Sequence, residues 1–142
     1  MATITDIADA VVQELNAGSW SLPLSAERHY RPLFDLADMA ALHVTVVPKG
    51  VVVERADWSR SQFDYQVDVA VQKKVAAVDN ATLDPLTALV QEVADFLRGR
   101  RLAALPAAMC VAVRNEPIYA PEHLDELRQF TSVLTFTYRV AR

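Results

Sequence analysis

Residues 63–71 read FDYQVDVAV and residues 84–99 read DPLTALVQEVADFLRG. The first stretch alternates large apolar side chains with mostly polar ones, which is the period of a strand with one buried face. The second places Leu, Val and Phe at helical spacing and so forms one apolar stripe from Leu86 to Arg98. Asp84 can cap this helix, Pro85 suits its first position, and Gly99 can end it. A one-sided strand followed by a one-striped helix predicts a sheet with a helix packed on it.

The rest of the chain adds one more helix and several strands. Thr3 or Thr5 can cap a first helix that ends by Gly18. Strands are expected at 42–48, 51–56, 62–75, 109–113 and 130–142, with Lys49-Gly50 as a hairpin turn and 79–83 as a loop. Prolines make 19–34 an irregular or edge segment. These elements predict an α+β fold, a mainly antiparallel β-sheet with two principal helices packed on one face, as a single domain over residues 1–142.

The composition restricts the class of protein. The 142 residues are 52% hydrophobic and carry a formal net charge of −4, which fits one domain with a sizeable core and not a broad basic face for nucleic acid. Cys110 is the only cysteine, so no intrachain disulfide can form, and its apolar surroundings predict a buried thiol. No signal peptide or membrane span is recognisable, so we expect a soluble protein made in a reducing compartment.

No catalytic or cofactor motif is present in the sequence. The three histidines are scattered rather than paired at metal-ligand spacing, so no metal is expected. Asp64 and Asp68 share the polar face of one strand, where they can simply face water. The three glycines lie far apart and cannot build a phosphate loop. We therefore expect no cofactor and no enzyme, with a small enzyme of unrecognised site as the remaining alternative.

Candidate interface residues come from two loops and from the irregular segment. The segment 24–34 mixes apolar groups with both charge signs, as subunit contacts do. Trp20 lies just before this segment and Trp58 lies in a second loop, and exposed aromatic residues are enriched at interfaces. An edge strand or a loop that covers the protein's own core explains the same pattern equally well. The candidates are Trp20, Arg28, Tyr30, Arg31, Phe34 and Trp58.

Three stretches, taken in order, resemble a known family. They are 24–36 (LSAERHYRPLFDL) running into 42–48 (LHVTVVP), then 64–69 (DYQVDV), then 130–139 (FTSVLTFTYR). Together they resemble the tail terminator or tail-completion proteins of long-tailed bacteriophages and prophages. The resemblance spans most of the chain and rests on pattern and order.

The resemblance implies an α+β protein that assembles with itself as a ring, typically a hexamer. Such a ring caps the tail tube, stops its growth and gives the head a docking surface. The implied partners are the tail-tube protein and a head-closure or connector protein. DNA would pass through without specific binding, and no membrane is involved. The implied location is the virion tail, after assembly in the host cytoplasm. A head-closure protein or another head–tail connector is the alternative within virion proteins.

Overall fold

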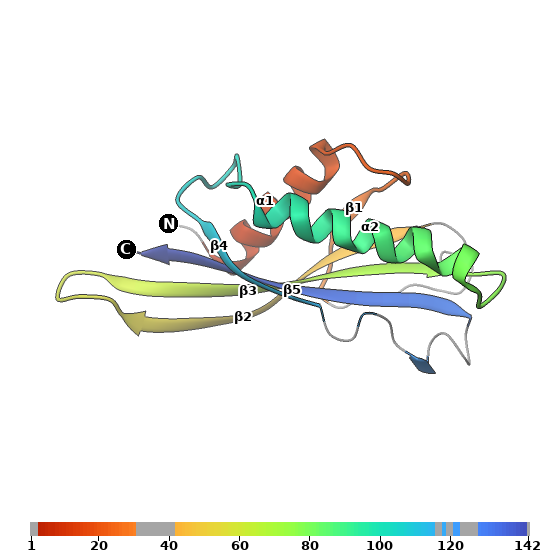
Figure 1. Cartoon of the computed structure of the whole chain (residues 1–142). Helices are drawn as coiled ribbons and strands as arrows, with labels where there is room; N and C mark the ends of the chain where they lie inside the picture. Colours follow the sequence, from red (N-terminus) through yellow and green to blue (C-terminus); the bar gives the residue numbers. More distant parts are fainter. Residues whose placement is uncertain (1–2, 31–41, 116–117, 119–120, 123–127, 142) are drawn as a thin grey trace.

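The computed structural model describes residues 3–30, 42–115, 118, 121–122 and 128–141. Its sheet has the strand order β1-β2-β3-β5-β4, with β1 parallel to β2 and every other pair antiparallel. Both helices lie on one face of this sheet (Figure 1), which confirms the predicted α+β fold. The elements are α1 (Ile4–Ala17), β1 (Ala26–Arg28), β2 (His43–Arg55), β3 (Ser61–Lys74), α2 (Asn80–Arg98), β4 (Met109–Asn115) and β5 (Gln129–Ala141).

Helix α1 begins where the sequence predicts. Thr3 is its N-cap: the Thr3 hydroxyl accepts from the Asp6 amide at 3.4 Å, and the Asp6 carboxylate accepts from the Thr3 amide at 2.9 Å. This reciprocal capping box satisfies two amides that the first turn cannot pair internally. The buried side of α1 carries Ile7, Val11 and Leu15, and it contacts β1, β2 and β3.

Helix α2 begins earlier than the sequence predicts. The N-cap is Asp79, whose carboxylate accepts from the Thr82 amide at 2.8 Å, and the helix starts at Asn80 with Pro85 inside it. The predicted loop at 79–83 and the predicted cap at Asp84 are therefore wrong. The chain contains two valid start signals in succession, and the earlier one brings Leu83 against the core.

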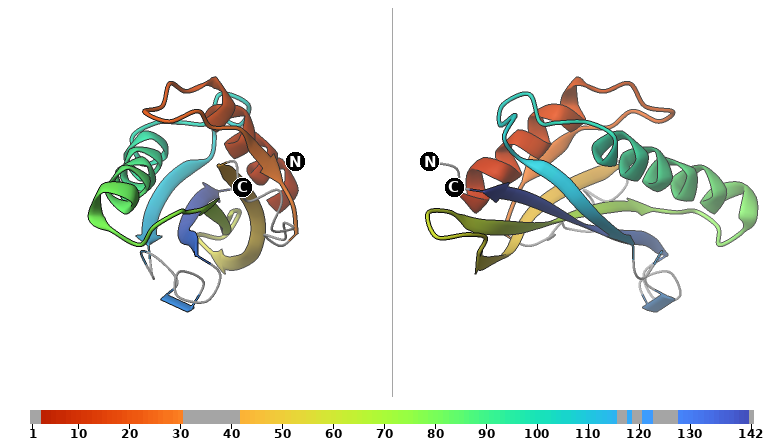
Figure 2. Two further views of the ribbon diagram at one scale, coloured as in Figure 1. Left: turned by 90° about the vertical axis from the view of Figure 1, so that its right-hand side faces the viewer. Right: turned by 60° about the vertical axis from the view of Figure 1, so that its left-hand side comes forward.

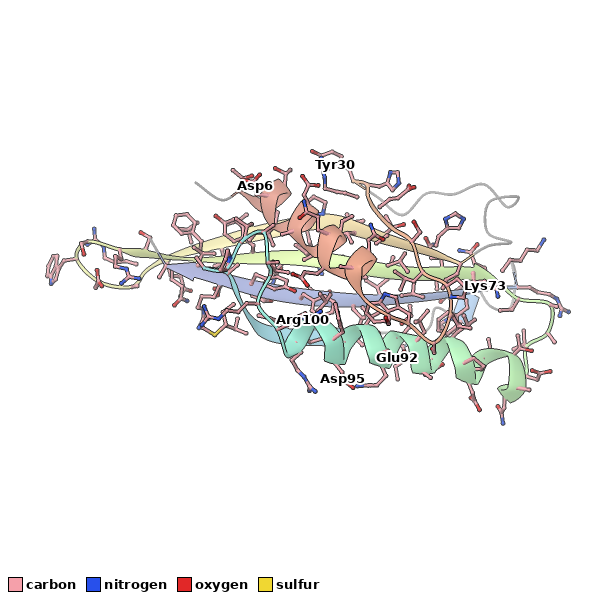
Figure 3. All side chains as sticks on the ribbon, turned by 90° about the horizontal axis from the view of Figure 1, so that it is seen from above. Asp6, Tyr30, Lys73, Glu92, Asp95 and Arg100 are labelled. Atoms are coloured by element: carbon pink, nitrogen blue, oxygen red, sulfur yellow. The ribbon has the colours of Figure 1, made fainter. Side chains whose placement is uncertain are left out.

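The apolar stripe of α2 is buried as predicted, but it packs on β4 and β5 and not on the β3 face that the sequence indicates. Leu89 and Val93 are fully buried, and so is the strand face that carries Tyr65, Val67 and Val69. Helix α2 contacts β4 and β5, whereas α1 covers β1 to β3. The two helices therefore divide the sheet between them, and both lie on its near side in Figure 3. Figure 2 shows the same arrangement around the twisted strands.

The predicted hairpin at Lys49-Gly50 does not form. Strand β2 runs unbroken from His43 to Arg55, and its register against β3 shifts between Pro48 and Gly50. Lys49 is the extra residue of a β-bulge between Pro48 and Gly50, and a bulge of this kind inserts a residue without reversing the chain. The chain reverses instead at 56–60, so β2 and β3 form one long hairpin. Figure 1 shows its tip extending beyond both helices, on the left of the view.

Candidate functional site

The hairpin tip holds the most exposed aromatic side chain in the described part of the protein. Trp58 is 94% exposed, and the Arg55 guanidinium lies 5.9 Å from the centre of its ring. The backbone beneath it is well defined by hydrogen bonds. Asp57 Oδ1 accepts from the amides of Ser59 and Arg60, both at 2.8 Å. Hydrogen bonds from Ser59 and Arg60 hold the pKa of Asp57 below its ordinary value. The carboxylate therefore fixes a turn that presents the indole to solvent.

Next to the tip, β2 exposes three consecutive valines. Val51, Val52 and Val53 are 42%, 48% and 55% exposed, although a valine run predicts burial on both faces. Strand β1 pairs with Val44–Val46, and beyond this level no strand of the described part of the chain lies on that side of β2. The sequence pattern does not predict these valines as surface residues. The feature that could have indicated their exposure is the run of valines after Gly50, in which apolar and polar residues no longer alternate. The prediction of two short strands in place of the single strand β2 obscured it.

Trp20 has an internal role. Its indole Nε1–H donates to the Leu15 carbonyl at 2.9 Å, and its ring packs edge-on against Phe96 with centroids 4.8 Å apart. A Cβ added at Gly18 would lie 2.8 Å from the Trp20 ring, so only glycine fits this close approach. These contacts join the end of α1 to α2. An interface role for Trp20 stays a prediction.

Arg28 and Tyr30 form a small exposed cluster at the β1 edge. Arg28 Nε donates to Asp9 Oδ1 at 2.7 Å, and its guanidinium lies 5.7 Å from the Tyr30 ring centre. Hydrogen bonds with Tyr30 and the charge of Asp9 raise the pKa of Arg28. Tyr30 is 74% exposed and lies at the edge of the molecule away from α2 (Figure 3). Arg31 and Phe34 lie outside the described residues.

The sheet face opposite the helices carries polar side chains that pair with one another. Arg139 donates to both oxygens of Asp64, at 2.9 and 3.1 Å. Asp68 accepts from the Thr135 hydroxyl at 2.7 Å and lies 3.7 Å from the Lys49 ammonium. A hollow of about 410 Å³ on this face is lined by Lys49, Gln66, Ala112, Arg114, Thr135 and Thr137. The Lys49 charge at this hollow is thus compensated by Asp68, and the Arg139 charge on the same face by Asp64.

The arginines around the end of α2 are also engaged. Arg98 pairs with Asp95 at 2.9 Å, as expected of a cation in the last turn of a helix. The Arg100 guanidinium stacks 4.0 Å above Phe96 and lies 3.6 Å from Glu14, and Arg101 donates to the Pro106 carbonyl at 3.1 Å. Arg100 thereby joins α1 to the segment after α2, so these cations serve the fold.

The described residues contain no group of three or more His, Cys, Asp or Glu able to hold a metal ion. Asp64 and Asp68 are paired as above, and burial raises the pKa of the Cys110 thiol, which disfavours the nucleophilic thiolate. Burial also raises the pKa of Tyr138. Within the same part of the chain, no helix is long and apolar enough to cross a membrane. The clearest candidate site is therefore a contact surface, the β2–β3 hairpin with its exposed valines and Trp58.

Comparison with known proteins gives a likeness at the level of fold. No family model and no curated protein matches the sequence. Among solved structures, a chain of the virion of a native gene transfer agent particle matches with a TM-score of 0.63 at 16% identity. This match covers 96% of this chain and 95% of that one, so the two share one fold over nearly their full lengths. A sheath/tube terminator of an extracellular contractile injection system, in its extended state, matches with a TM-score of 0.47 at 17% identity; all of this chain aligns, over 57% of that one.

Proposed function

We propose that this protein is a structural component of a phage-like tail, which caps the tail tube as a ring, stops its growth and offers the head a docking surface. The observation that carries the proposal is the fold, shared over 96% of this chain with a component of a gene transfer agent virion. The resemblance of the sequence to tail terminators supports the same role. In this proposal the partners are other copies of the chain, the tail-tube protein and a head-closure or connector protein.

The hairpin supports a role in contacting a partner. Exposed tryptophans anchored on a fixed turn supply large contact area at little entropic cost, and such residues dominate binding energy at interfaces. Trp58 is held this way by the Asp57 turn, and the tip of the β2–β3 hairpin extends beyond the helices (Figure 1). We assign it to the contact with the tail-tube protein.

The polar sheet face supports passage of DNA without specific binding. A surface that grips DNA needs unpaired Lys and Arg to neutralise phosphates. On this face Arg139 is committed to Asp64 and Lys49 lies beside Asp68, while the whole chain carries a net charge of −4. We therefore assign this face to the bore of the ring. Among the described residues, no cluster of His, Cys, Asp or Glu that could hold a metal ion competes with this structural role.

The test is binding to tube ends. Preformed tubes of the tail-tube protein from the same virus are sheared to several mean lengths and mixed with this protein at constant tube mass. A protein that caps ends binds in proportion to the number of ends, so the amount that co-sediments rises as the tubes become shorter. A protein that binds the tube wall follows tube mass and does not respond to shearing.

Trp58→Ala tests the assignment of the hairpin tip. The side chain is 94% exposed, so its loss leaves the fold intact, and we expect end binding to fall at least tenfold. Val78→Ala is the matched control, because Val78 is an exposed apolar residue outside the hairpin, and it should bind like the parent. If binding of the parent protein follows tube mass, it binds the tube wall and the terminator role is contradicted. If the parent protein does not bind tubes at all, the terminator role is also contradicted and a head-closure protein is favoured.

A further inference from the structure

We infer that neighbouring copies of this chain join edge to edge, with the open half of β2 in one copy paired antiparallel to β4 of the next. The inference deepens the proposed function, because it rests on the ring and names the strands that close it. The occupant of each open edge is thus a second copy of the chain. Three observations support the inference: two strand edges are open, the two strands run in compatible directions, and they lie at the same level of the sheet.

The first open edge is the distal half of β2. Strand β1 ends at Arg28, opposite Val46, so from Val47 to Arg55 the only strand beside β2 in the described part is β3. Residues 50–53 in this half read GVVV and contain no charge and no proline. Such an edge presents free backbone amides and carbonyls beside apolar side chains, which is a template for strand addition.

The second open edge is β4, at the other side of the sheet. Within the described residues its single strand neighbour is β5. Residues 109–113 read MCVAV, and Met109 and Val111 are 52% and 40% exposed. Each edge thus has an uncharged stretch, 50–53 in β2 and 109–113 in β4, between or beside charged residues such as Lys49, Glu54 and Arg114. An uncharged exposed stretch of strand edge favours aggregation unless it is covered.

The directions of the two edges are compatible. Strands β2, β3, β5 and β4 alternate in direction, so β2 and β4 run antiparallel within one subunit. Rotation about a ring axis along the strands preserves strand direction. The β4 of the neighbouring copy therefore arrives antiparallel to β2, and the ladder continues from copy to copy. Repetition of one such heterologous contact closes a ring and leaves no edge open.

The two edges also lie at the same level of the sheet. Met109 is opposite Arg139, Arg139 is opposite Asp64, and Asp64 is opposite Val52. The other end of β4 aligns through Leu134 and Val69 with Val46. A lateral repeat of the subunit thus sets β4 beside the part of β2 that β1 leaves open. The stagger that accompanies closure moves this pairing along the strand without losing it.

Disulfide trapping tests this pairing, in a Cys110→Ala background so that only introduced thiols react. Val52 and Ala112 are exposed and lie on the sheet face opposite the helices, since their strand partners there are Asp64 and Thr137. Met109 shares that face. The variants carry Val52→Cys with either Ala112→Cys or Met109→Cys. The two pairs test two positions of β4 along the β2 strand of the neighbouring copy. Facing thiols of adjacent strands approach the separation that a disulfide needs.

The expected result is a ladder of covalent oligomers under mild oxidation, at protein concentrations where sedimentation shows assembly or on tube ends. The ladder should disappear on reduction, and each single-cysteine variant should stop at dimers. The control is Val53→Cys with Ala112→Cys, because Val53 points to the helix face, and it should yield at least tenfold less ladder.

The inference is overturned if assembled protein gives no ladder with either pair, if the control crosslinks as well, or if the protein stays monomeric both free and on tubes. These results are separable from a failure of the proposed function. End binding without a ladder refutes only the strand pairing. A ladder without end binding supports the pairing and refutes the terminator role.

Discussion

At the scale of single residues, Cys110 shows how a correct pattern gives an incomplete picture. The sequence predicts a buried thiol in an apolar strand, and burial does raise its pKa. The structure places it in edge strand β4, half-buried, with the thiol donating to the Ala112 carbonyl at 3.7 Å. The neighbouring residues in the sequence show that Cys110 lies in an apolar stretch. They do not show whether that strand is central or at an edge of the sheet, because this depends on pairing between distant segments.

Cys110→Ala should fold and assemble like the parent protein. The side chain is small and only half-buried, so we expect a loss of about 1 kcal/mol in the free energy of unfolding. Chemical denaturation measures this loss, and sedimentation measures assembly. A variant that folds normally yet fails to assemble would show that the thiol itself takes part in the subunit contact.

At the scale of elements, the periodicity of the sequence predicts which helices and strands exist better than it predicts the residues at which they begin and end. The apolar stripes of α1 and α2, the central strand β3 and the long terminal strand β5 are all recognisable in the sequence. The start of α2 and the continuity of β2 are not, because Asp79 and Asp84 both satisfy the rules for a cap and Lys49-Gly50 fits a turn as well as a bulge. Packing of Leu83 and pairing with β3 decide these cases.

The candidate site likewise contains residues that the sequence indicates and residues that it does not. The sequence places Trp58 in a loop and leaves open whether it is exposed or covers the core, and the structure shows that it is exposed. Val51–Val53 are missed, because their exposure follows from the shortness of β1, a tertiary fact that no local pattern carries. Trp20 shows the converse case, an aromatic beside a loop that is used to join the two helices.

The position of the α2 cap makes a pH-dependent prediction. Hydrogen bonds from the Thr82 side chain and amide lower the pKa of Asp79 from its ordinary value of 3.8. Because the folded pKa is depressed, the ionised carboxylate stabilises the fold above the ordinary value, and this stabilisation is lost as the pH falls through the folded pKa. Asp79→Ala should lower the Tm at neutral pH, and its difference from the parent should shrink in acid.

Asp84→Ala is the matched control for Asp79→Ala. Asp84 is exposed within the helix and should affect the Tm little, without the same acid dependence. Thermal melts across the pH range, followed by circular dichroism, distinguish the two carboxylates. A larger loss for Asp84→Ala at neutral pH would contradict the observed start of α2 and restore the one expected from the Asp-Pro signal.

At the scale of the whole molecule, the features that stand out are surfaces for contact with other proteins, not an enclosed binding pocket. Two helices cover one face of the sheet, charge pairs compensate the other, and a long hairpin with exposed valines and Trp58 extends from one end. Among the described residues, neither the distal half of β2 nor β4 has a second strand neighbour, and the two lie at one level of the sheet. This arrangement suits a subunit that completes its fold by contact with copies of itself and with a tube.

The most direct measurement of the central claim is the length of tail tubes that polymerise in the presence of this protein. Purified tail-tube protein is assembled with increasing amounts of it, and the tube lengths are measured by negative-stain electron microscopy. The account predicts that the mean length falls as the protein is added, that each stopped end carries a ring, and that Trp58→Ala restores long tubes. Bare tubes that grow equally long with and without the protein would contradict the terminator role.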